Sequence, residues 1–125
     1  MDFNNLKNKR ILVTGSTGFK GSWLCTWLLS LDATVYGFAL PPKLGAPLYD
    51  QLRLRDRIEQ HDGDIRDADV VKTVMNKIKP DVIFHLAAQA LVHKSYSDPQ
   101  LTFDTNVSGA INLLEAVKSL DLLCA

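Results

Sequence analysis

The stretch LVTGSTGFKGSWL, residues 12–24, decides the fold of this chain. A short apolar run leads into glycines at positions 15, 18 and 21, and the sequence then continues with helical spacing. Gly15 would allow a tight turn out of a strand, Gly18 would let the backbone approach a phosphate, and Gly21 would let the helix pack close to the sheet. A strand, a glycine-rich turn and a helix in this order predict a pyrophosphate site at the amino-terminal end of the helix. The alternative is a structural turn in an unrelated α/β domain.

Outward from this stretch, short strand-like runs alternate with helical periods. Strands are expected at residues 11–13, 34–39, 57–61 and 81–85. Helices are expected from Phe19, over 48–55, after the capping residue Asp67, and from Ser97 onward, with Pro80 ending the third. This alternation predicts one α/β domain over residues 1–125. It would be the amino-terminal, four-strand portion of a Rossmann-type parallel sheet, with strand order 3-2-1-4 and helices on both faces.

The helical spacing also predicts which side chains are buried. In the first helix the expected core face consists of Trp23, Leu24, Trp27, Leu28 and Leu31. In the helix after Asp67 it consists of Val70, Val71, Val74 and Ile78. In the last and longest helix it consists of Phe103, Val107, Ala110, Ile111, Leu114 and Val117.

Composition and charge exclude several classes of protein. The 125 residues include 14 basic and 14 acidic side chains, so no overall field attracts nucleic acid or an anionic membrane. No apolar run approaches the roughly 18 residues of a membrane span, and the amino-terminal residues lack the apolar core of a signal peptide. Cys25 and Cys124 are the only cysteines, which favours a reducing compartment. We therefore expect a soluble cytoplasmic protein without nucleic-acid or membrane partners.

A metal site is not expected. His61, His85 and His93 lie in separate segments, without the i, i+4 spacing or the cysteine partners typical of metal ligands. His85 closes an apolar strand, where a hydrogen-bonded core histidine is more common than a catalytic one.

The sequence leaves the choice between NAD and NADP open. In the dinucleotide-binding pattern, an acidic residue about 20 positions after the glycines binds the adenosine ribose of NAD. Here no Asp or Glu occurs between Ala33 and Tyr49, and Lys43 is the nearest charge after the second strand. NAD is the expected cofactor, and Lys43 keeps NADP open.

Four motifs then occur in order along the chain: TGSTGFKGSWL (14–24), GDIRD (63–67), HLAAQALVHKSYSDP (85–99) and TNVSGAINLLEA (105–116). Together they resemble the extended short-chain dehydrogenases/reductases that act on nucleotide sugars, in register from about Lys9 to Lys118. The pairing of GFKGSWL with VYGFALPP and HLAAQALV resembles the CDP-glucose 4,6-dehydratases most closely. The resemblance implies an NAD-dependent lyase in deoxysugar and lipopolysaccharide synthesis. It also implies CDP-glucose as substrate and a homo-oligomeric full-length enzyme.

The resemblance assigns roles to individual residues. The pyrophosphate loop would consist of Gly15, Thr17, Gly18, Phe19, Lys20 and Gly21. Asp64 and the backbone of Ile65 would bind adenine, although Asp64 in Asp-Gly-Asp is also a common turn residue. The ribose and nicotinamide side would be lined by Leu86, Ala87, Ala88 and Gln89, with Thr105 reaching the cofactor from the long helix. Asn106 would support the active site, and residues 90–96 would border the sugar-nucleotide pocket. His93 stands where the family is expected to have Arg.

The reaction that the resemblance implies needs a Tyr-x-x-x-Lys pair, which this chain lacks. Tyr36, Tyr49 and Tyr96 are followed four positions later by Leu40, Arg53 and Gln100. We therefore expect the cofactor-binding portion of a larger enzyme, inactive alone and prone to self-association, whose catalytic and sugar-binding parts lie outside these 125 residues. Two alternatives remain: another NAD(P)-dependent nucleotide-sugar epimerase or reductase, and a non-catalytic NAD(P)-binding module.

Overall fold

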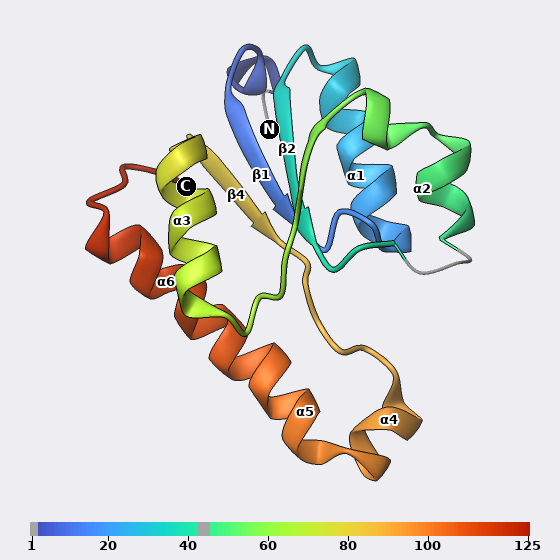
Figure 1. The fold of residues 1–125 in the computed structure, drawn as a ribbon. Helices are drawn as coiled ribbons and strands as arrows, with labels where there is room; N and C mark the ends of the chain where they lie inside the picture. The colour runs from blue at the N-terminus through green and yellow to red at the C-terminus, as the bar shows by residue number, and fades with distance from the viewer. Residues whose placement is uncertain (1–2, 43–45) are drawn as a thin grey trace.

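A computed structural model describes residues 3–42 and 46–125, so Lys43 lies outside the described residues. Its centre is a four-stranded parallel sheet in the order β3-β2-β1-β4. Figure 1 labels β2, β1 and β4, which lie side by side. The strands are β1 (Arg10–Thr14), β2 (Thr34–Ala39), β3 (Glu59–Asp62) and β4 (Val82–His85). The predicted α/β class and the strand order 3-2-1-4 are confirmed.

Helices cover both faces of the sheet. On one face lie α1 (Phe19–Ser30), α2 (Pro47–Gln51) and the 3-10 turn η2 (Leu54–Asp56). On the other, α3 (Ala68–Ile78) packs against α6 (Gly109–Ser119). The short helices α4 (Val92–Ser97) and α5 (Pro99–Phe103) extend beyond the carboxyl ends of the strands (Figure 1). A 3-10 turn, η1 (Phe3–Leu6), precedes β1, and a π-helical turn, η3 (Asp104–Ser108), joins α5 to α6.

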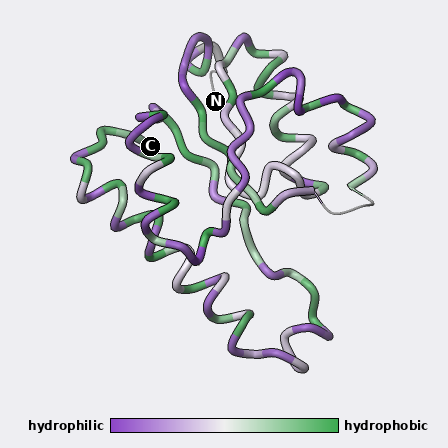
Figure 2. Tube along the Cα trace, in the orientation of Figure 1, coloured by the Kyte–Doolittle hydropathy of each residue, from purple (hydrophilic) through white to green (hydrophobic). Residues whose placement is uncertain are grey.

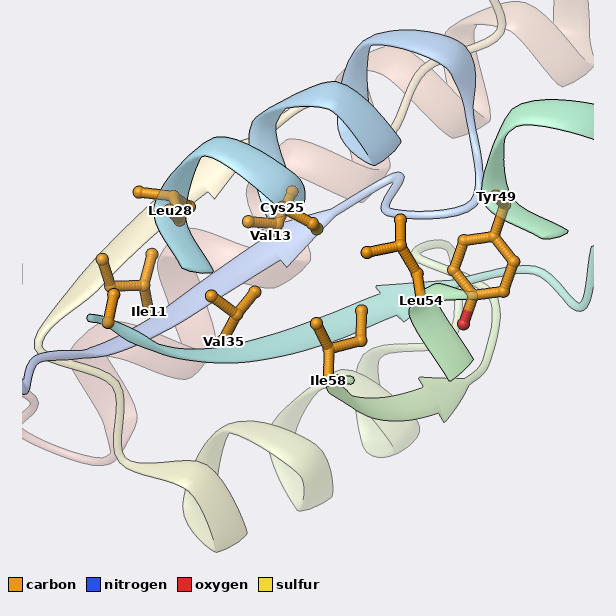
Figure 3. Close-up of a cluster of buried hydrophobic side chains, with 9 residues drawn as sticks. Ile11, Val13, Cys25, Leu28, Val35, Tyr49, Leu54 and Ile58 are labelled. Carbon is orange, nitrogen blue, oxygen red and sulfur yellow. The ribbon is translucent and has the colours of Figure 1, made fainter. Parts of the chain in front are cut away.

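Strand β1 supplies the centre of the core. Ile11 and Val13 are buried on one face, in a cluster that includes Cys25 and Leu28 of α1 (Figure 3). Leu12 is buried on the opposite face. Because a parallel strand is covered on both sides, its residues form an apolar run instead of an alternating pattern. The apolar colour of β4 in Figure 2 has the same cause.

Helix α3 begins as the sequence predicts. The Asp67 carboxylate accepts hydrogen bonds from the backbone N–H groups of Asp69 and Val70, each at 3.1 Å. These bonds satisfy donors that have no partner within the helix, which makes Asp67 an N-cap. The helix ends at Ile78, before Lys79 takes a left-handed conformation and Pro80 follows.

Several expected elements have different bounds. The first strand occupies 10–14 instead of 11–13 and the fourth 82–85 instead of 81–85, and the helix expected from Ser97 begins at Pro99 and consists of α5, η3 and α6. The third strand occupies 59–62 instead of 57–61. The helix expected over 48–55 consists of α2 and η2, separated at Arg53, whose φ of 50° places it in the left-handed region and interrupts the helix. Helix α4 is not predicted from the sequence, because VHKSYS is too short to show a helical period.

The predicted buried face of α1 is wrong in part. Leu28 is fully buried, but Trp23 is 52% exposed and Trp27 is 40% exposed. The helix instead buries its small residues Gly21, Ser22 and Cys25. Their small side chains let the helix axis approach the sheet and the glycine turn closely, and an indole in the same place would hold the helix away.

The predicted buried face of the last helix is also wrong in part, since Val117 packs against the core but other members do not. Helix α6 buries Gly109, Leu113 and Ala116, whereas Ile111 and Leu114 are mostly exposed. Gly109 permits this approach, because a Cβ there would lie 2.7 Å from Ile65 Cγ2. Phe103 and Val107 are exposed as well, and they precede or lie in the π turn, which changes the helical register.

After α6 the backbone returns to the free edge of β4. The Ile83 N–H donates to the Ala125 carbonyl at 2.7 Å, and the Ala125 N–H donates to the Asp81 carbonyl at 3.1 Å. A residue bonded on both sides to alternate residues of its neighbour has the pattern of a parallel ladder. Ala125 thus lies beside β4 and bonds to it as a parallel neighbour would.

Candidate functional site

A crevice of about 560 Å³ opens at the carboxyl ends of the strands. It lies where the chain order reverses, because β1 has β2 on one side and β4 on the other. Ligands of open α/β sheets bind at such switch points. The crevice is lined by Gly15, Thr17, Gly18, Phe38, Ala39, Leu40, Gly63, Asp64, Ile65, Arg66, Leu86, Ala87, Ala88, Gln89, Leu91, Lys94, Leu101 and Thr105.

The glycine turn forms one wall of the crevice. Gly15 has a φ of 72°, a conformation that L-amino acids other than glycine rarely adopt, and its N–H donates to the Phe38 carbonyl at 2.8 Å. The Gly18 N–H donates to the Gly15 carbonyl at 3.0 Å, which closes the turn. Helix α1 begins at the next residue, and no side chain in the described part of the chain caps it. Its first N–H groups and the positive end of its dipole favour an anion here.

Most of the residues assigned by resemblance line this crevice. They are Gly15, Thr17, Gly18, Asp64, Ile65, Leu86, Ala87, Ala88, Gln89 and Thr105. Phe19 lines a neighbouring hollow of about 410 Å³, together with Thr17, Gly18 and residues that follow β2. Lys20 and Gly21 belong to α1 and line neither hollow within the described residues.

Gly21 lies in α1 and packs directly against the backbone of the glycine turn. A Cβ at this position would overlap the Gly15 carbonyl oxygen and would lie 2.9 Å from Ser16 Cα. The close contact is therefore with the glycine turn itself, so the absence of a side chain at Gly21 sets the distance between α1 and the backbone of this turn.

Asp64 has a charged partner that the sequence analysis did not assign. Both carboxylate oxygens of Asp64 accept from Arg66 Nε at 3.0 Å, and the Arg66 backbone N–H donates to Oδ1 at 2.9 Å. The Arg66 guanidinium holds the pKa of the Asp64 carboxyl below its ordinary value. Asp64 is thus kept ionised, as an acceptor facing the crevice. The adjacent charges in GDIRD were the available signal for this pair.

The ion pair predicts a pH-dependent contribution to stability. Because the folded-state pKa of Asp64 is lowered, the contribution is present above the unfolded pKa of 3.8 and is lost as the pH falls through the folded value. We expect Asp64→Asn to lower the free energy of unfolding at pH 7 by about 0.5–1 kcal/mol, since the pair is partly exposed. Urea unfolding of both proteins should give converging stabilities below the folded pKa. If the two proteins differed in free energy of unfolding by the same amount at pH 7 and below the folded pKa of Asp64, the stabilising role of the ion pair would be contradicted.

Asn106 holds the loop after β4. Its Oδ1 accepts from the Gln89 N–H at 2.7 Å, and its Nδ2 donates to the Gln89 carbonyl at 3.1 Å. The Gln89 side chain in turn donates to Thr102 Oγ1 at 3.0 Å and accepts from the Leu91 N–H at 2.8 Å. Asn106 lies in the π turn, a feature often found at functional sites. Its side chain thus fixes the backbone of a residue that lines the crevice.

Several lining residues were missed by sequence reasoning. Phe38, Ala39 and Gly63 sit at the ends of β2 and β3, where apolar strand residues give no separate signal. Lys94 lines the crevice from α4, in a segment that was expected only to border the sugar nucleotide. His93 is its neighbour in sequence and does not belong to the crevice lining formed by the described residues.

Two further findings concern the described ranges 3–42 and 46–125. Within them, no three His, Cys, Asp or Glu side chains come together in a way that could hold a metal ion. None of the helices found in these ranges combines the length and the apolarity needed to cross a membrane.

Known proteins resemble this chain in sequence. CDP-glucose 4,6-dehydratase of Salmonella typhimurium (strain LT2) is 47% identical over 118 residues, which cover 94% of this chain and 33% of the relative. A GDP-mannose 4,6-dehydratase of Vibrio cholerae is 33% identical over 125 residues, covering 91% of this chain and 32% of the relative. The chain therefore spans about a third of the length of the curated relatives it matches.

The fold has solved counterparts as well. The UDP-glucose 4-epimerase of Thermus thermophilus, solved as a complex with NAD, superposes with a TM-score of 0.78 at 31% identity. The match covers 90% of this chain and 35% of the epimerase. A family model described as GDP-mannose 4,6 dehydratase matches residues 12–124. The predicted relationship to nucleotide-sugar dehydratases and epimerases is confirmed, and the chain belongs to the GDP-mannose 4,6-dehydratase family.

Proposed function

We propose that this chain is the NAD-binding part of a nucleotide-sugar 4,6-dehydratase whose substrate is CDP-glucose. The observation that carries the proposal is the crevice at the switch point, bounded by the glycine turn and by the start of α1. The pyrophosphate would lie against Gly15 and Gly18, where no Cβ is in the way, and would accept from the first backbone N–H groups of α1.

The other walls suit the two ends of the dinucleotide. Asp64, paired with Arg66, would accept from the exocyclic amine of adenine, between the ends of β2 and β3. Ala87, Ala88 and Gln89 would line the nicotinamide side, next to the segment that carries Lys94. When bound, NAD would take a hydride from the sugar and return it. This chain would bind and orient the cofactor.

Two observations support the finer assignment. Identity to the CDP-glucose enzyme is 47%, against 33% for the GDP-mannose enzyme over a similar span. The basic side chains that line the crevice within the described residues, Arg66 and Lys94, follow β3 and lie in α4, and the end of β2 presents Leu40, Pro41 and Pro42 without a basic side chain. A 2′-phosphate would need such a charge, so we propose NAD as the cofactor.

Calorimetric titration of the 125-residue chain tests the cofactor claim. We expect NAD⁺ to bind at one site per chain and NADP⁺ to bind more weakly. Preferential binding of NADP⁺ would contradict the choice of NAD and direct attention to Lys43. Binding of neither nucleotide would contradict the proposed function of this chain.

Chimeric enzymes test the substrate claim. The matching 118 residues of the Salmonella CDP-glucose 4,6-dehydratase would be replaced by this chain, and the Vibrio GDP-mannose 4,6-dehydratase would receive the same exchange as a control. We expect dehydration of CDP-glucose by the first chimera and a much lower rate from the second with GDP-mannose. The CDP-glucose assignment would be contradicted if the first chimera folded and bound NAD but did not dehydrate CDP-glucose. It would also be contradicted if the two chimeras dehydrated their host's substrates equally well.

A further inference from the structure

One hydroxyl group joins the two strands that flank the crevice. Thr14 ends β1 and pairs in register with His85, which ends β4. The Thr14 side chain is fully buried, and its Oγ1 lies 2.7 Å from His85 Nδ1. The same Oγ1 accepts from the backbone N–H groups of Leu86 and Ala87, each at 3.1 Å. A single atom thus contacts both strands and the first two residues of the crevice wall.

The number of donors around Oγ1 favours one direction for the bond to His85. A threonine hydroxyl has one hydrogen to donate and two lone pairs that accept. The N–H groups of Leu86 and Ala87 only donate, and Oγ1 accepts from both, although the Leu86 N–H is shared with the Thr14 carbonyl at 3.2 Å. This arrangement leaves the hydroxyl hydrogen for His85 Nδ1, which then acts as the acceptor. His85 is then the neutral tautomer with its proton on Nε2.

The backbone of Leu86 and Ala87, which Thr14 holds, packs closely against the glycine turn. Leu86 and Ala87 line the crevice opposite Gly15. A Cβ placed on Gly15 would lie 2.9 Å from Ala87 N and 2.9 Å from the Leu86 carbonyl carbon. The peptide between Leu86 and Ala87 thus rests directly on the glycine turn. A change in the orientation of this peptide would alter the crevice where the turn and the wall meet.

We propose that His85 is a positioning residue for the bound dinucleotide, acting through Thr14. By accepting the only hydroxyl hydrogen of Thr14, the His85 ring keeps both lone pairs of that hydroxyl on the Leu86 and Ala87 N–H groups. Within the described residues His85 does not line the crevice, so it acts through the wall and makes no contact with the ligand. This inference rests on the proposed dinucleotide site.

The alternative is that His85 is a core residue that only stabilises the sheet. The two roles predict different effects when His85 is replaced by Asn or by Gln. Asn at position 85 can present an amide oxygen near the place of Nδ1, whereas Gln reaches the place of Nε2 and leaves the Thr14 hydroxyl without its acceptor. A residue of purely structural value would show no such preference for an acceptor at the Nδ1 position.

The test combines nitrogen-15 NMR of the histidine rings with NAD⁺ titration. In the unliganded chain we expect the His85 ring to carry its proton on Nε2, with the signal assigned by its loss in His85→Asn. We expect His85→Gln to weaken NAD⁺ binding about tenfold, and His85→Asn to bind within about threefold of the wild type. The same pattern should appear at position 14, where Thr14→Ser keeps the hydroxyl and Thr14→Val removes it.

The outcomes separate the two proposals. A proton on Nδ1 in a chain that binds NAD⁺, or equal affinities of the Asn and Gln variants, would overturn the role of His85 and leave the dinucleotide site standing. A wild-type chain that binds no NAD⁺ would overturn the site itself, and the positioning role with it. If the variants at position 85 fail to fold, the ring spectrum of the wild-type chain and the affinity of Thr14→Ser decide the matter.

Discussion

Replacing Gly21 with alanine is expected to destabilise the fold by about 2 kcal/mol or more, although alanine is the better helix former. Propensity alone would make Gly→Ala in a helix favourable by about 1 kcal/mol. The added Cβ would overlap the Gly15 carbonyl oxygen and lie 2.8 Å from the Gly15 carbonyl carbon. These are backbone atoms of a closed turn, so α1 must move away from the sheet, and overpacking of this kind costs about 1–3 kcal/mol or more.

Urea unfolding followed by circular dichroism measures this loss. Gly18→Ala is the matched control, because a Cβ there would meet a single atom, the Gly15 carbonyl oxygen, at 3.2 Å. We expect the control to stay within about 1 kcal/mol of the wild type. A Gly21→Ala protein as stable as the wild type would show that the approach of α1 to the turn does not limit this fold.

The largest effect on binding is expected for Gly18→Val. Gly18 has φ −77° and ψ 169°, an extended conformation that any residue adopts, so the backbone itself tolerates a side chain. In the crevice, however, the valine side chain would occupy the place that the pyrophosphate needs. We expect NAD⁺ affinity to fall about a hundredfold or more, equivalent to the cost of a severe steric clash.

Calorimetry and urea unfolding should be applied to the same preparations. Thr34→Val is a suitable control, because Thr34 is exposed at the opposite end of β2 and keeps a β-branched side chain. It should bind NAD⁺ like the wild type. If Gly18→Val bound NAD⁺ normally, the pyrophosphate would not lie against the glycine turn. If Gly18→Val unfolded as well as losing NAD⁺ affinity, the claim that the backbone at position 18 tolerates a side chain would be wrong.

The sheet was predictable because its signals are local. Apolar runs bounded by glycine, proline and aspartate marked β1, β2 and β4, and a cap such as Asp67 marked a helix start, whereas β3 (EQHD) has no apolar run and was expected from its place in the alternation. The buried faces of α1 and α6 were not predictable from spacing. Each helix has apolar residues on more than one side, and tertiary contacts selected the side with small residues, such as Gly21 and Gly109. Close approach of backbones outweighed the burial of the largest side chains.

In the candidate site, too, some residues could be predicted from local sequence spacing and others could not. Gly15 and Gly18, which line the crevice, could be predicted because their spacing is typical of a dinucleotide-binding turn. The bond between Arg66 and Asp64 is a matter of side-chain conformation, and the two bonds of Asn106 to Gln89 join residues 17 positions apart. Contacts of this kind depend on how loops meet in space. One sequence carries no spacing rule for them.

The π turn at Asp104–Ser108 also has a consequence for how this region tolerates insertions and deletions. A π turn contains one residue more than an α turn, and removing that residue would restore a regular α-helix. Everything on its amino-terminal side would then rotate by about 100° relative to α6. Such a deletion would turn α5 and the loop contacts of Asn106 away from the crevice while it preserved the helix. Length variation here would thus act as a change of register, and alignments that place a gap within these five residues should be interpreted as a change in the site.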